Sequence, residues 1–422
     1  MEFESSRSFS RLLDKQDSLS HFRTRFSIPE PDLIYLDGNS LGRLTFASAE
    51  RLQDLSEEWG RDLIRGYNQD WWQAPGRTGE KIARLVGAAP GQIVVSDTVS
   101  VNLFKLTAAA LALDNGRKKI ITDTLNFPSD LYILQGLVRL LGDRHTIMRI
   151  GSKDDEVTPD LDALEAAIDK DTALITLSHV TFKSGYLYDM AAITELAHRR
   201  GALVLWDLSH SAGAVPVALD TCNVDFAIGC TYKYLNGGPG SPAFLYVGKH
   251  LQEQVASPIW GWWGQKEPFA FGLDYVPAQG ITRFLTGSQP IISLLAMEAA
   301  LDPLLEAGMD ALRIKSLQLS EYLIYLTGEF LVPLGFSLGT PRIREQRGSH
   351  VSLRHPEGYR INRALIEEMK VIPDFREPDN LRLGLTPLYT TFGEVYEGVD
   401  RIRRTVTEKR YENYPTQRLT VT

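Results

Sequence analysis

The feature that most constrains the fold is a series of short apolar runs that alternate with helical patterns between residues 92 and 248. The runs "QIVVS", "KKIITD" and "TALITLS" are followed by the helical patterns "NLFKLTAAALAL", "SDLYILQGLVRLL" and "MAAITELAHRR", and "ALVLWD", "VDFAIGC" and "AFLYVG" complete the series. Strands rich in Val, Ile and Leu that are separated by helices predict a mainly parallel sheet covered on both faces. We therefore expect a doubly wound α/β domain, which binds ligands at the carboxyl ends of its strands.

The pattern changes after about residue 290. Two long helical stretches, 290–305 and 309–330, lead into "HVSLRHP", a helix near 361–370, "NLRLGLTP" and a final helix. This order predicts a smaller α+β domain joined by a long helix. We expect residues 61–290 to form the large domain and 291–422 the linking helix and small domain, with 1–60 packing back on the small domain. A chain of 422 residues fits this division.

Composition excludes several classes of protein. The formal net charge is −8, which argues against an extended surface for nucleic acid. Only Cys222 and Cys230 are available as thiols, so we expect neither a disulfide framework nor a metal site. The polar start lacks the apolar core of a secretory signal, and no stretch approaches 18 uninterrupted apolar residues. We expect a cytoplasmic protein without a membrane anchor.

The glycine-rich stretch "NGGPG" at 236–240 resembles a phosphate-binding loop at first sight. A dinucleotide fingerprint, however, needs GxGxxG at the opening of a helix, whereas these glycines lie between two apolar runs. The Walker A pattern GxxxxGK[ST] is absent from the sequence. A tight turn between two strands is the competing interpretation.

Asp207 and Lys233 form the most informative pair of residues. Asp207 directly follows the apolar run "ALVLW", and Lys233 follows the next run, 26 residues later. Alone, the aspartate is explained as a loop or capping residue and the lysine as a solvated side chain. At one edge of a sheet, they match the needs of pyridoxal 5′-phosphate, which takes a lysine for its aldehyde and a carboxylate for its ring nitrogen. We predict this cofactor.

Two further stretches supply candidate cofactor contacts. "SDTVS" at 96–100 offers hydroxyls just before a helix, where free backbone amides and the helix dipole favour a phosphate. Ordinary capping of that helix by Ser100 is the alternative. "NFPSD" at 126–130 follows another strand and offers the ring of Phe127 and the carboxylate of Asp130. Stacking of Phe127 on a planar cofactor competes with simple packing in the core.

Six stretches resemble the kynureninase family, especially its bacterial members, over roughly residues 30–400. In order they are "IYLDGNSLG", "NFPSD", "WDLSHSAGAVPV", "CTYKYLNGGPGS", "RGSHVS" and "LTPLYTTF". The resemblance implies a pyridoxal-phosphate enzyme of fold-type I, a homodimer with its active site at the subunit interface. It implies hydrolysis of L-kynurenine, or of 3-hydroxykynurenine, to anthranilate or 3-hydroxyanthranilate and L-alanine, within tryptophan degradation and the kynurenine pathway to NAD.

The resemblance assigns roles to individual residues. Lys233 would bond to the cofactor and move the substrate α-proton, Tyr232 would act as phosphate ligand and proton relay, and Asp207 would pair with the ring nitrogen. Arg382 would hold the substrate α-carboxylate, a task that suits a planar guanidinium. Cofactor contacts are implied for Val99, Ser100, Phe127, Pro128, Ser129, Asp130, Ser178 and His210, for Trp262 and Ser288 from the partner subunit, and substrate contacts for Asn39 and Ser40.

Three positions depart from the family pattern. Tyr67 stands where a tryptophan or histidine is usual, Gln265 replaces a histidine expected near the substrate ring, and Phe182 lacks a tyrosine hydroxyl. An amide can form hydrogen bonds but cannot transfer a proton near neutral pH as an imidazole can. If these residues face one pocket, they indicate an altered ring preference or a different substrate. Neutral drift is the competing explanation.

Two other functions are weighed against hydrolysis of kynurenine. The first is a related fold-type I lyase or transaminase that acts on another β-acyl or related amino acid. The second is a catalytically silent protein that binds the cofactor. The silent protein is disfavoured because Lys233, Asp207 and Arg382 are all present.

Overall fold

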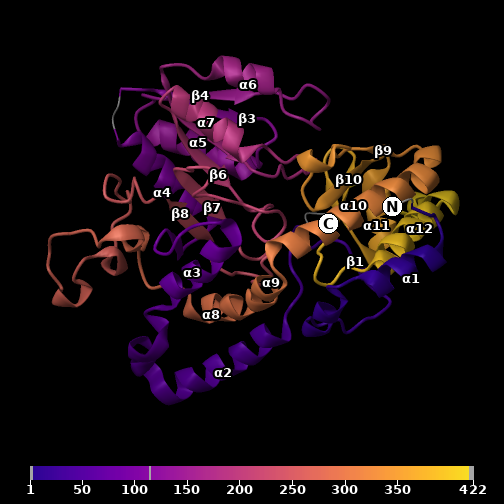
Figure 1. Ribbon diagram of the computed structural model, residues 1–422, viewed down its shortest axis with the longest axis horizontal. Coiled ribbons are helices and arrows are strands. Elements are labelled where there is room, and N and C mark those ends of the chain that lie inside the picture. Colours follow the sequence, from indigo (N-terminus) through magenta and orange to yellow (C-terminus); the bar gives the residue numbers. More distant parts are fainter. Residues whose placement is uncertain (1–2, 114–115, 418–422) are drawn as a thin grey trace.

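The computed structural model describes residues 3–113 and 116–417, and its largest sheet has seven strands (Figure 1). Their order is β2-β8-β7-β6-β5-β3-β4. Every neighbouring pair from β7 to β4 is parallel, and β8 runs antiparallel to β7 and β2. The mainly parallel sheet is therefore confirmed. The strands are β2 (Ile93–Val95), β3 (Lys119–Asp123), β4 (Thr146–Ile150), β5 (Thr172–Ser178), β6 (Leu203–Asp207), β7 (Phe226–Gly229) and β8 (Phe244–Val247).

Burial along the central strands explains why they are apolar throughout. Every residue of β5 and β7 is buried, and successive side chains of a strand point to opposite faces. Both faces of the sheet are therefore covered, as the near-continuous apolar runs predict. The covering helices include α3 (Ala74–Val86), α4 (Val99–Leu111), α5 (Pro128–Leu140), α6 (Leu161–Ala167) and α7 (Met190–Arg199).

A second hydrophobic cluster lies in the C-terminal part of the chain. It contains Leu323, Val351, Leu383 and Val395. Its antiparallel sheet has the order β12-β13-β10-β9, with β9 (Ser337–Leu338), β10 (His350–Arg354), β12 (Asp374–Arg376) and β13 (Asn380–Gly384). Three helices also contribute side chains to this hydrophobic cluster: α10 (Met309–Leu326), α11 (Gly358–Glu367) and α12 (Phe392–Thr407). The α+β class expected here is confirmed.

The first 60 residues contact both parts of the molecule. Helix α1 (Arg7–Gln16) packs on α12, and β1 (Ile34–Tyr35) pairs with β11 (Val371–Ile372). Helix α2 (Phe46–Asp62) instead runs along α8 (Ile291–Ala300), as Figure 1 shows. The boundaries at residues 60 and 290 stay a prediction.

The linking region is divided into three helices. Gly308, which has a φ of 76°, separates α9 (Asp302–Ala307) from α10. This backbone region favours glycine because it lacks a Cβ atom. The α10 helix ends at Leu326 and continues as a π turn over Thr327–Leu331. Of the two predicted long helices, the first is broken at Leu301 between α8 and α9, and the second is α-helical to Leu326 and completed by the π turn.

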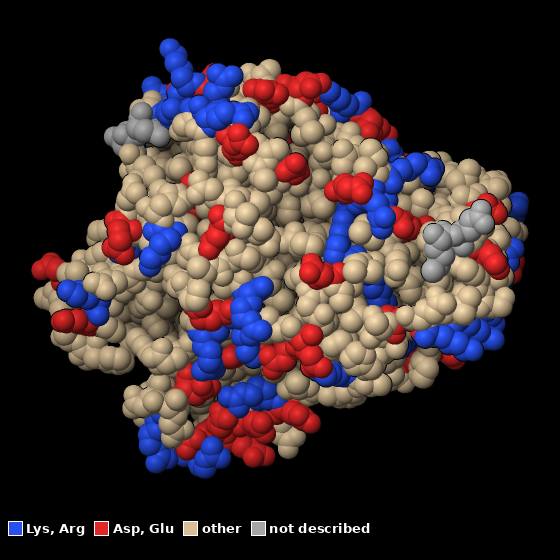
Figure 2. All heavy atoms as spheres, in the orientation of Figure 1, with Lys and Arg blue, Asp and Glu red and all other residues tan. Residues whose placement is uncertain are grey.

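The surface carries mixed charge. On the face shown in Figure 2, positive and negative side chains are interspersed over the elements. Within residues 3–113 and 116–417, helices with the length and apolar character needed to cross a membrane are absent.

Candidate active site

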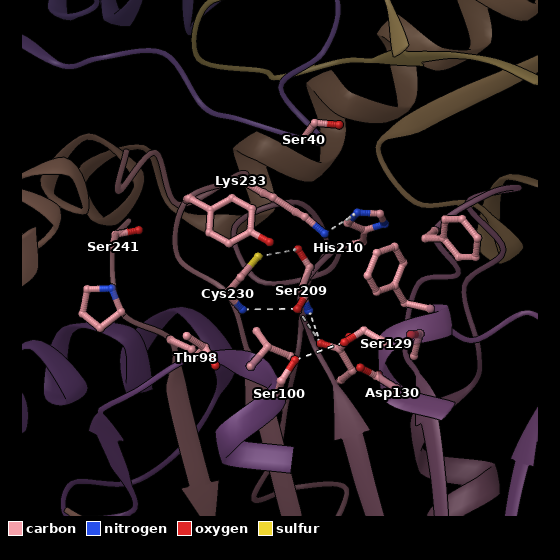
Figure 3. A pocket seen from close by; sticks show the side chains of 18 of the residues that line it. Ser40, Thr98, Ser100, Ser129, Asp130, Ser209, His210, Cys230, Lys233 and Ser241 are labelled. Carbon is pink, nitrogen blue, oxygen red and sulfur yellow. Dashed lines mark hydrogen bonds between the residues drawn. The ribbon is translucent and has the colours of Figure 1, made fainter. Parts of the chain in front are cut away.

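A cavity of about 650 Å³ lies at the carboxyl ends of the parallel strands, between the large sheet and the C-terminal sheet. Figure 3 shows many of its side chains pointing toward one another from separate elements. The cavity brings together fourteen of the eighteen predicted site residues: Asn39, Ser40, Val99, Ser100, Phe127, Ser129, Asp130, Ser178, Asp207, His210, Tyr232, Lys233, Ser288 and Arg382. Pro128, the first residue of α5, does not line it.

Lys233 follows β7 and reaches into the cavity. Its Nζ lies 2.8 Å from Nε2 of His210 (Figure 3). Burial and the charge of Lys233 hold the pKa of His210 well below its usual value, so this imidazole is neutral and accepts a hydrogen bond from the lysine. The buried Nδ1 of His210 has no partner among the described residues. This leaves a polar atom available to a bound group.

Two carboxylates lie deeper in the cavity. Asp207 ends β6, and its Oδ1 accepts hydrogen bonds from the amide and the hydroxyl of Ser209 at 2.8 and 2.6 Å. Asp130 lies in the first turn of α5, and its buried Oδ2 has no partner among the described residues. Burial raises the pKa of both, and the charge of Asp207 raises that of Asp130 further. An N–H group that carries positive charge would satisfy this pair, as a protonated pyridine ring would.

The turn before α4 presents amides and hydroxyls to the cavity. Thr98 caps the helix, since its hydroxyl accepts from the amide of Val101 at 3.3 Å. The interpretation of Ser100 as the cap is therefore wrong, and its hydroxyl instead lies 3.1 Å from that of Ser129. The free amides at the start of this 13-residue helix fit a phosphate group.

The glycine-rich stretch connects β7 to β8. Gly238 and Gly240 have φ values of 82° and 75°, and Gly240 to Ala243 line the cavity. Substitution at Gly237 would place a Cβ 2.4 Å from Met297. The stretch is therefore a strand-to-strand turn on the cavity wall, and the phosphate-loop interpretation is wrong.

Arg382 approaches the cavity from the C-terminal sheet. It is almost fully buried and forms an ion pair with Asp374, its partner across β12 and β13. Its guanidinium also donates to the carbonyl of Phe182 and to the hydroxyl of Ser40. Burial lowers the pKa of Arg382 to about 10, so it stays charged at neutral pH. Its Nε is buried and without a partner among the described residues, which leaves a donor for a carboxylate.

Asn39 adds a second unsatisfied group on this side. It is fully buried, and both polar atoms of its side chain have no partner among the described residues. Sequence reasoning missed Asp374 and Arg376, although Arg376 lines the cavity and donates to Asp374 at 2.6 Å. The sequence did contain a signal for these two residues. They alternate in "DFR", just before the strand of Arg382, and alternate residues of a strand point to the same face of a sheet.

The residues expected around the substrate ring are dispersed. Tyr67 begins the π turn Tyr67–Trp71 and lines a neighbouring apolar groove, which shares Gln289 with the cavity. Gln265 is bonded within its own loop, where it accepts from the amides of Lys266 and Val276 at 2.9 and 2.8 Å. Phe182 does line the cavity. Of the three departures, Phe182 alone lines the cavity of its own chain, and the interpretation that all three face one pocket stays a prediction.

Trp262 and Ser288 were expected to act from a partner subunit. Trp262 is 40% exposed and packs beside Trp72, away from the cavity of its own chain. Ser288 lines the cavity of its own chain.

The comparisons with known proteins agree over most of the chain. Residues 35–330 match the model of aminotransferase class-V, and residues 312–402 match that of the kynureninase C-terminal domain. A kynureninase of Pseudomonas fluorescens is 48% identical over 393 residues, covering 92% of each chain. A kynureninase of Burkholderia pseudomallei (strain 1106a) is 44% identical over 397 residues, covering 93% of each.

Solved structures share the fold at lower identity. The cystine C-S lyase C-DES, in complex with cysteine persulfide, gives a TM-score of 0.77 at 20% identity, covering 88% of this chain and 98% of its own. The apo cysteine desulfurase of Thermococcus onnurineus NA1 gives 0.77 at 18%, covering 94% and 98%. At these identities the likeness extends to the fold alone.

Proposed function

The chain belongs to the kynureninase family, and from this premise we propose that it hydrolyses the Cβ–Cγ bond of L-kynurenine or 3-hydroxykynurenine. The products are anthranilate or 3-hydroxyanthranilate and L-alanine. The observation that carries the proposal is one cavity in which Lys233 and Asp207 lie together with Arg382. A lyase or transaminase acting on another amino acid is not favoured, because relatives at 44–48% identity are kynureninases.

The cofactor is pyridoxal 5′-phosphate. Lys233 would bind its aldehyde, Asp207 and Asp130 its ring nitrogen, and the turn at 98–100 its phosphate. Phe127 lines the same cavity and offers a ring face 44% exposed. When bound, this cofactor supplies an electron sink for bonds at the substrate α-carbon.

The remaining chemistry belongs to the side chains. Arg382 binds the substrate α-carboxylate through a charge-assisted hydrogen bond, and Asn39 and Ser40 lie on the same side of the cavity. Lys233 would take the substrate α-proton at its Nζ, and neutral His210 keeps this amine oriented. Burial raises the pKa of Tyr232, so its phenol remains protonated and can donate a proton during bond cleavage.

The finer assignments belong to the same proposal. We propose a cytoplasmic homodimer that acts in tryptophan degradation by the kynurenine pathway, with Trp262, Tyr67 and Gln265 near the cavity of the partner subunit. The exposed side chains of Trp262, Phe269 and Phe271 support this, because they lie beside one another and a contiguous apolar patch at the surface indicates an interaction site.

Two measurements test the function. Borohydride reduction of the purified protein, followed by peptide mapping, should place the cofactor adduct on Lys233. Turnover assays with L-kynurenine and 3-hydroxykynurenine should release L-alanine and the matching aryl acid. Absence of alanine and aryl acid with both substrates, in a protein that carries the adduct, would leave the cofactor assignment intact and overturn the hydrolysis.

A further inference from the structure

A buried lysine lies beneath the turn proposed to hold the cofactor phosphate. Lys105, in α4, is fully buried, and its Nζ donates to Oδ2 of Asp97 and to the carbonyl of Phe284, both at 2.8 Å. Lys105 does not line the cavity, and none of the proposed catalytic steps uses it. Burying an ammonium group costs free energy unless the group is paired, so a lysine at this position needs a structural or functional explanation.

Its partner Asp97 does line the cavity, directly before the residues that begin α4. Asp97 has a φ of 51°, and its Oδ2 accepts from the hydroxyl of Ser96 at 2.6 Å. Burial acts to raise its pKa, but the charge of Lys105 and the hydrogen bonds from Lys105, Ser96 and Thr286 hold that pKa below the usual value. The carboxylate is therefore ionised at neutral pH.

An ionised carboxylate at this turn opposes the binding of an anion. A phosphate monoester carries about −1.5 to −2 charges at pH 7. Two like charges in a partly buried site repel strongly, because the effective dielectric constant there is well below that of water. Lys105 supplies the opposite charge from behind the turn, so the pair contributes little net charge to the cavity.

The pair also fixes the geometry of the cavity wall. The carbonyl of Asp97 accepts from the amide of Ala243 at 2.8 Å, which joins the turn to the segment after Gly240. The bond from Lys105 to Phe284 joins α4, behind this turn, to the segment that leads to Ser288. The backbone of Asp97 and the side chain of Lys105 therefore link three segments at the wall of the cavity.

We propose that Lys105 is a positioning residue for the cofactor, which neutralises Asp97 and so makes the turn at 97–100 able to accept the phosphate. The proposal deepens the assignment of pyridoxal 5′-phosphate and rests on it. Pyridoxal lacks the phosphate and would not be repelled by Asp97. Loss of Lys105 should therefore weaken the binding of pyridoxal 5′-phosphate more than the binding of pyridoxal. The ratio of the two affinities thus isolates the role of Lys105.

In the test, the full-length protein is freed of cofactor and titrated with pyridoxal 5′-phosphate and, separately, with pyridoxal. The absorbance of the Lys233 adduct gives the affinity for each ligand. In Lys105→Met, we expect the affinity for pyridoxal 5′-phosphate to fall at least about tenfold more than that for pyridoxal. The double variant Asp97→Asn/Lys105→Met removes both charges and should regain most of the lost ratio. Equal losses for the two ligands, or no recovery in the double variant, would overturn the proposal.

Lys315→Met is the matched control. Lys315 is also buried and pairs with Asp17 at 2.6 Å, but neither residue lines the cavity. This variant should lose stability and keep the wild-type ratio of affinities. If it changes the ratio as much as Lys105→Met does, the effect is general destabilisation and the proposal fails.

Asp97→Asn keeps the test decisive if Lys105→Met does not fold. It removes the negative charge, so its preference for pyridoxal 5′-phosphate over pyridoxal should equal or exceed that of the wild type. A preference about tenfold lower would contradict the proposed charge compensation. The absorbance titration needs no kynurenine, so its result does not depend on the proposed hydrolysis. Binding of pyridoxal 5′-phosphate by the wild-type protein tests the cofactor assignment itself.

Discussion

Arg382 illustrates how a single side chain is prepared for its ligand before the ligand arrives. Asp374 on the neighbouring strand forms an ion pair with it, and its guanidinium also donates hydrogen bonds to the carbonyl of Phe182 and the hydroxyl of Ser40. The planar guanidinium is thereby oriented, so less conformational entropy is lost when it binds a carboxylate.

Replacing Arg382 by lysine should therefore weaken substrate binding. A lysine keeps the charge but loses the planar fork, and a hydrogen bond to a charged group contributes about 1.5–3 kcal/mol. We expect KM for L-kynurenine to rise roughly ten- to hundredfold, with an unchanged affinity for the cofactor. Steady-state kinetics and cofactor titration measure both. Arg363→Lys should behave as wild type, because Arg363 pairs with Glu367 in α11 and does not line the cavity.

His198 provides a pH-dependent contribution to stability. Its Nε2 lies 2.8 Å from Oδ2 of the buried Asp225, and this hydrogen bond raises the pKa of His198. A raised pKa in the folded state means that the stabilisation is complete below the unfolded pKa of about 6.5 and is lost as pH rises through the folded value. His198→Gln should thus lower the melting temperature more at pH 5.5 than at pH 9. An equal loss at both would contradict a charged pair.

At the scale of elements, helix α12 has the clearest local signal. Thr391 accepts from the amide of Glu394 at 3.0 Å, Glu394 accepts from the amide of Thr391 at 2.9 Å, and Asp14 of the first helix accepts from the amides of Phe392 and Gly393. Backbone donors at the start of α12 are thus satisfied by side chains from both ends of the chain.

Removing the cap should destabilise the protein without affecting the active site. Loss of a threonine cap costs about 1 kcal/mol, so Thr391→Ala should lower the free energy of unfolding by that amount. Chemical denaturation measures the change, and turnover per folded molecule should stay constant. Thr407→Ala, at the other end of the same helix, should cost much less because that residue is exposed.

The elements also explain where sequence reasoning succeeded. The buried strands β5 and β6 were predicted almost to the residue, because both of their faces are covered. Strand β4 was missed because it lies at the sheet edge with mostly exposed or half-buried residues, including Arg149, so its pattern is not apolar. Lys105 was missed as well, since a lysine in a helical pattern gives no sign that it is buried beside a carboxylate.

The site divides in the same way. Asp207 and Lys233 could be predicted because Asp207 ends β6 and Lys233 lies four residues beyond β7, and parallel strands bring such positions to one edge. The surroundings of Tyr67 and Gln265 could not, because they depend on a π turn and on hydrogen bonds within a loop that has no periodic pattern.

At the scale of the whole molecule, residues from the parts of the chain that form both hydrophobic clusters line the cavity. Asp207 ends a strand of the large sheet and Lys233 lies in the loop after the neighbouring strand, whereas Arg376 and Arg382 belong to the C-terminal sheet. A ligand that contacts both sides therefore stabilises the folded molecule as a whole by mass action.

Removal of the cofactor should lower the melting temperature. At a cofactor concentration of about 100 times Kd, the linkage contributes roughly 2.7 kcal/mol. Calorimetry with and without pyridoxal 5′-phosphate measures the shift. The shift should shrink strongly in Lys233→Ala, which cannot form the covalent bond. A shift of wild-type size in that variant would contradict the role of Lys233.

The reversed direction of β8 has a consequence for how the catalytic turn is held. A parallel strand after β7 would have needed a crossover of a dozen or more residues on the outside of the sheet. Because β8 is antiparallel, the chain leaves β7 at Gly229 and re-enters the sheet at Phe244 on the same rim, beside the end of β2. The connection of residues 230–243 therefore stays at the carboxyl rim of the sheet instead of crossing one of its faces, and Lys233 lies in it four residues beyond the end of β7.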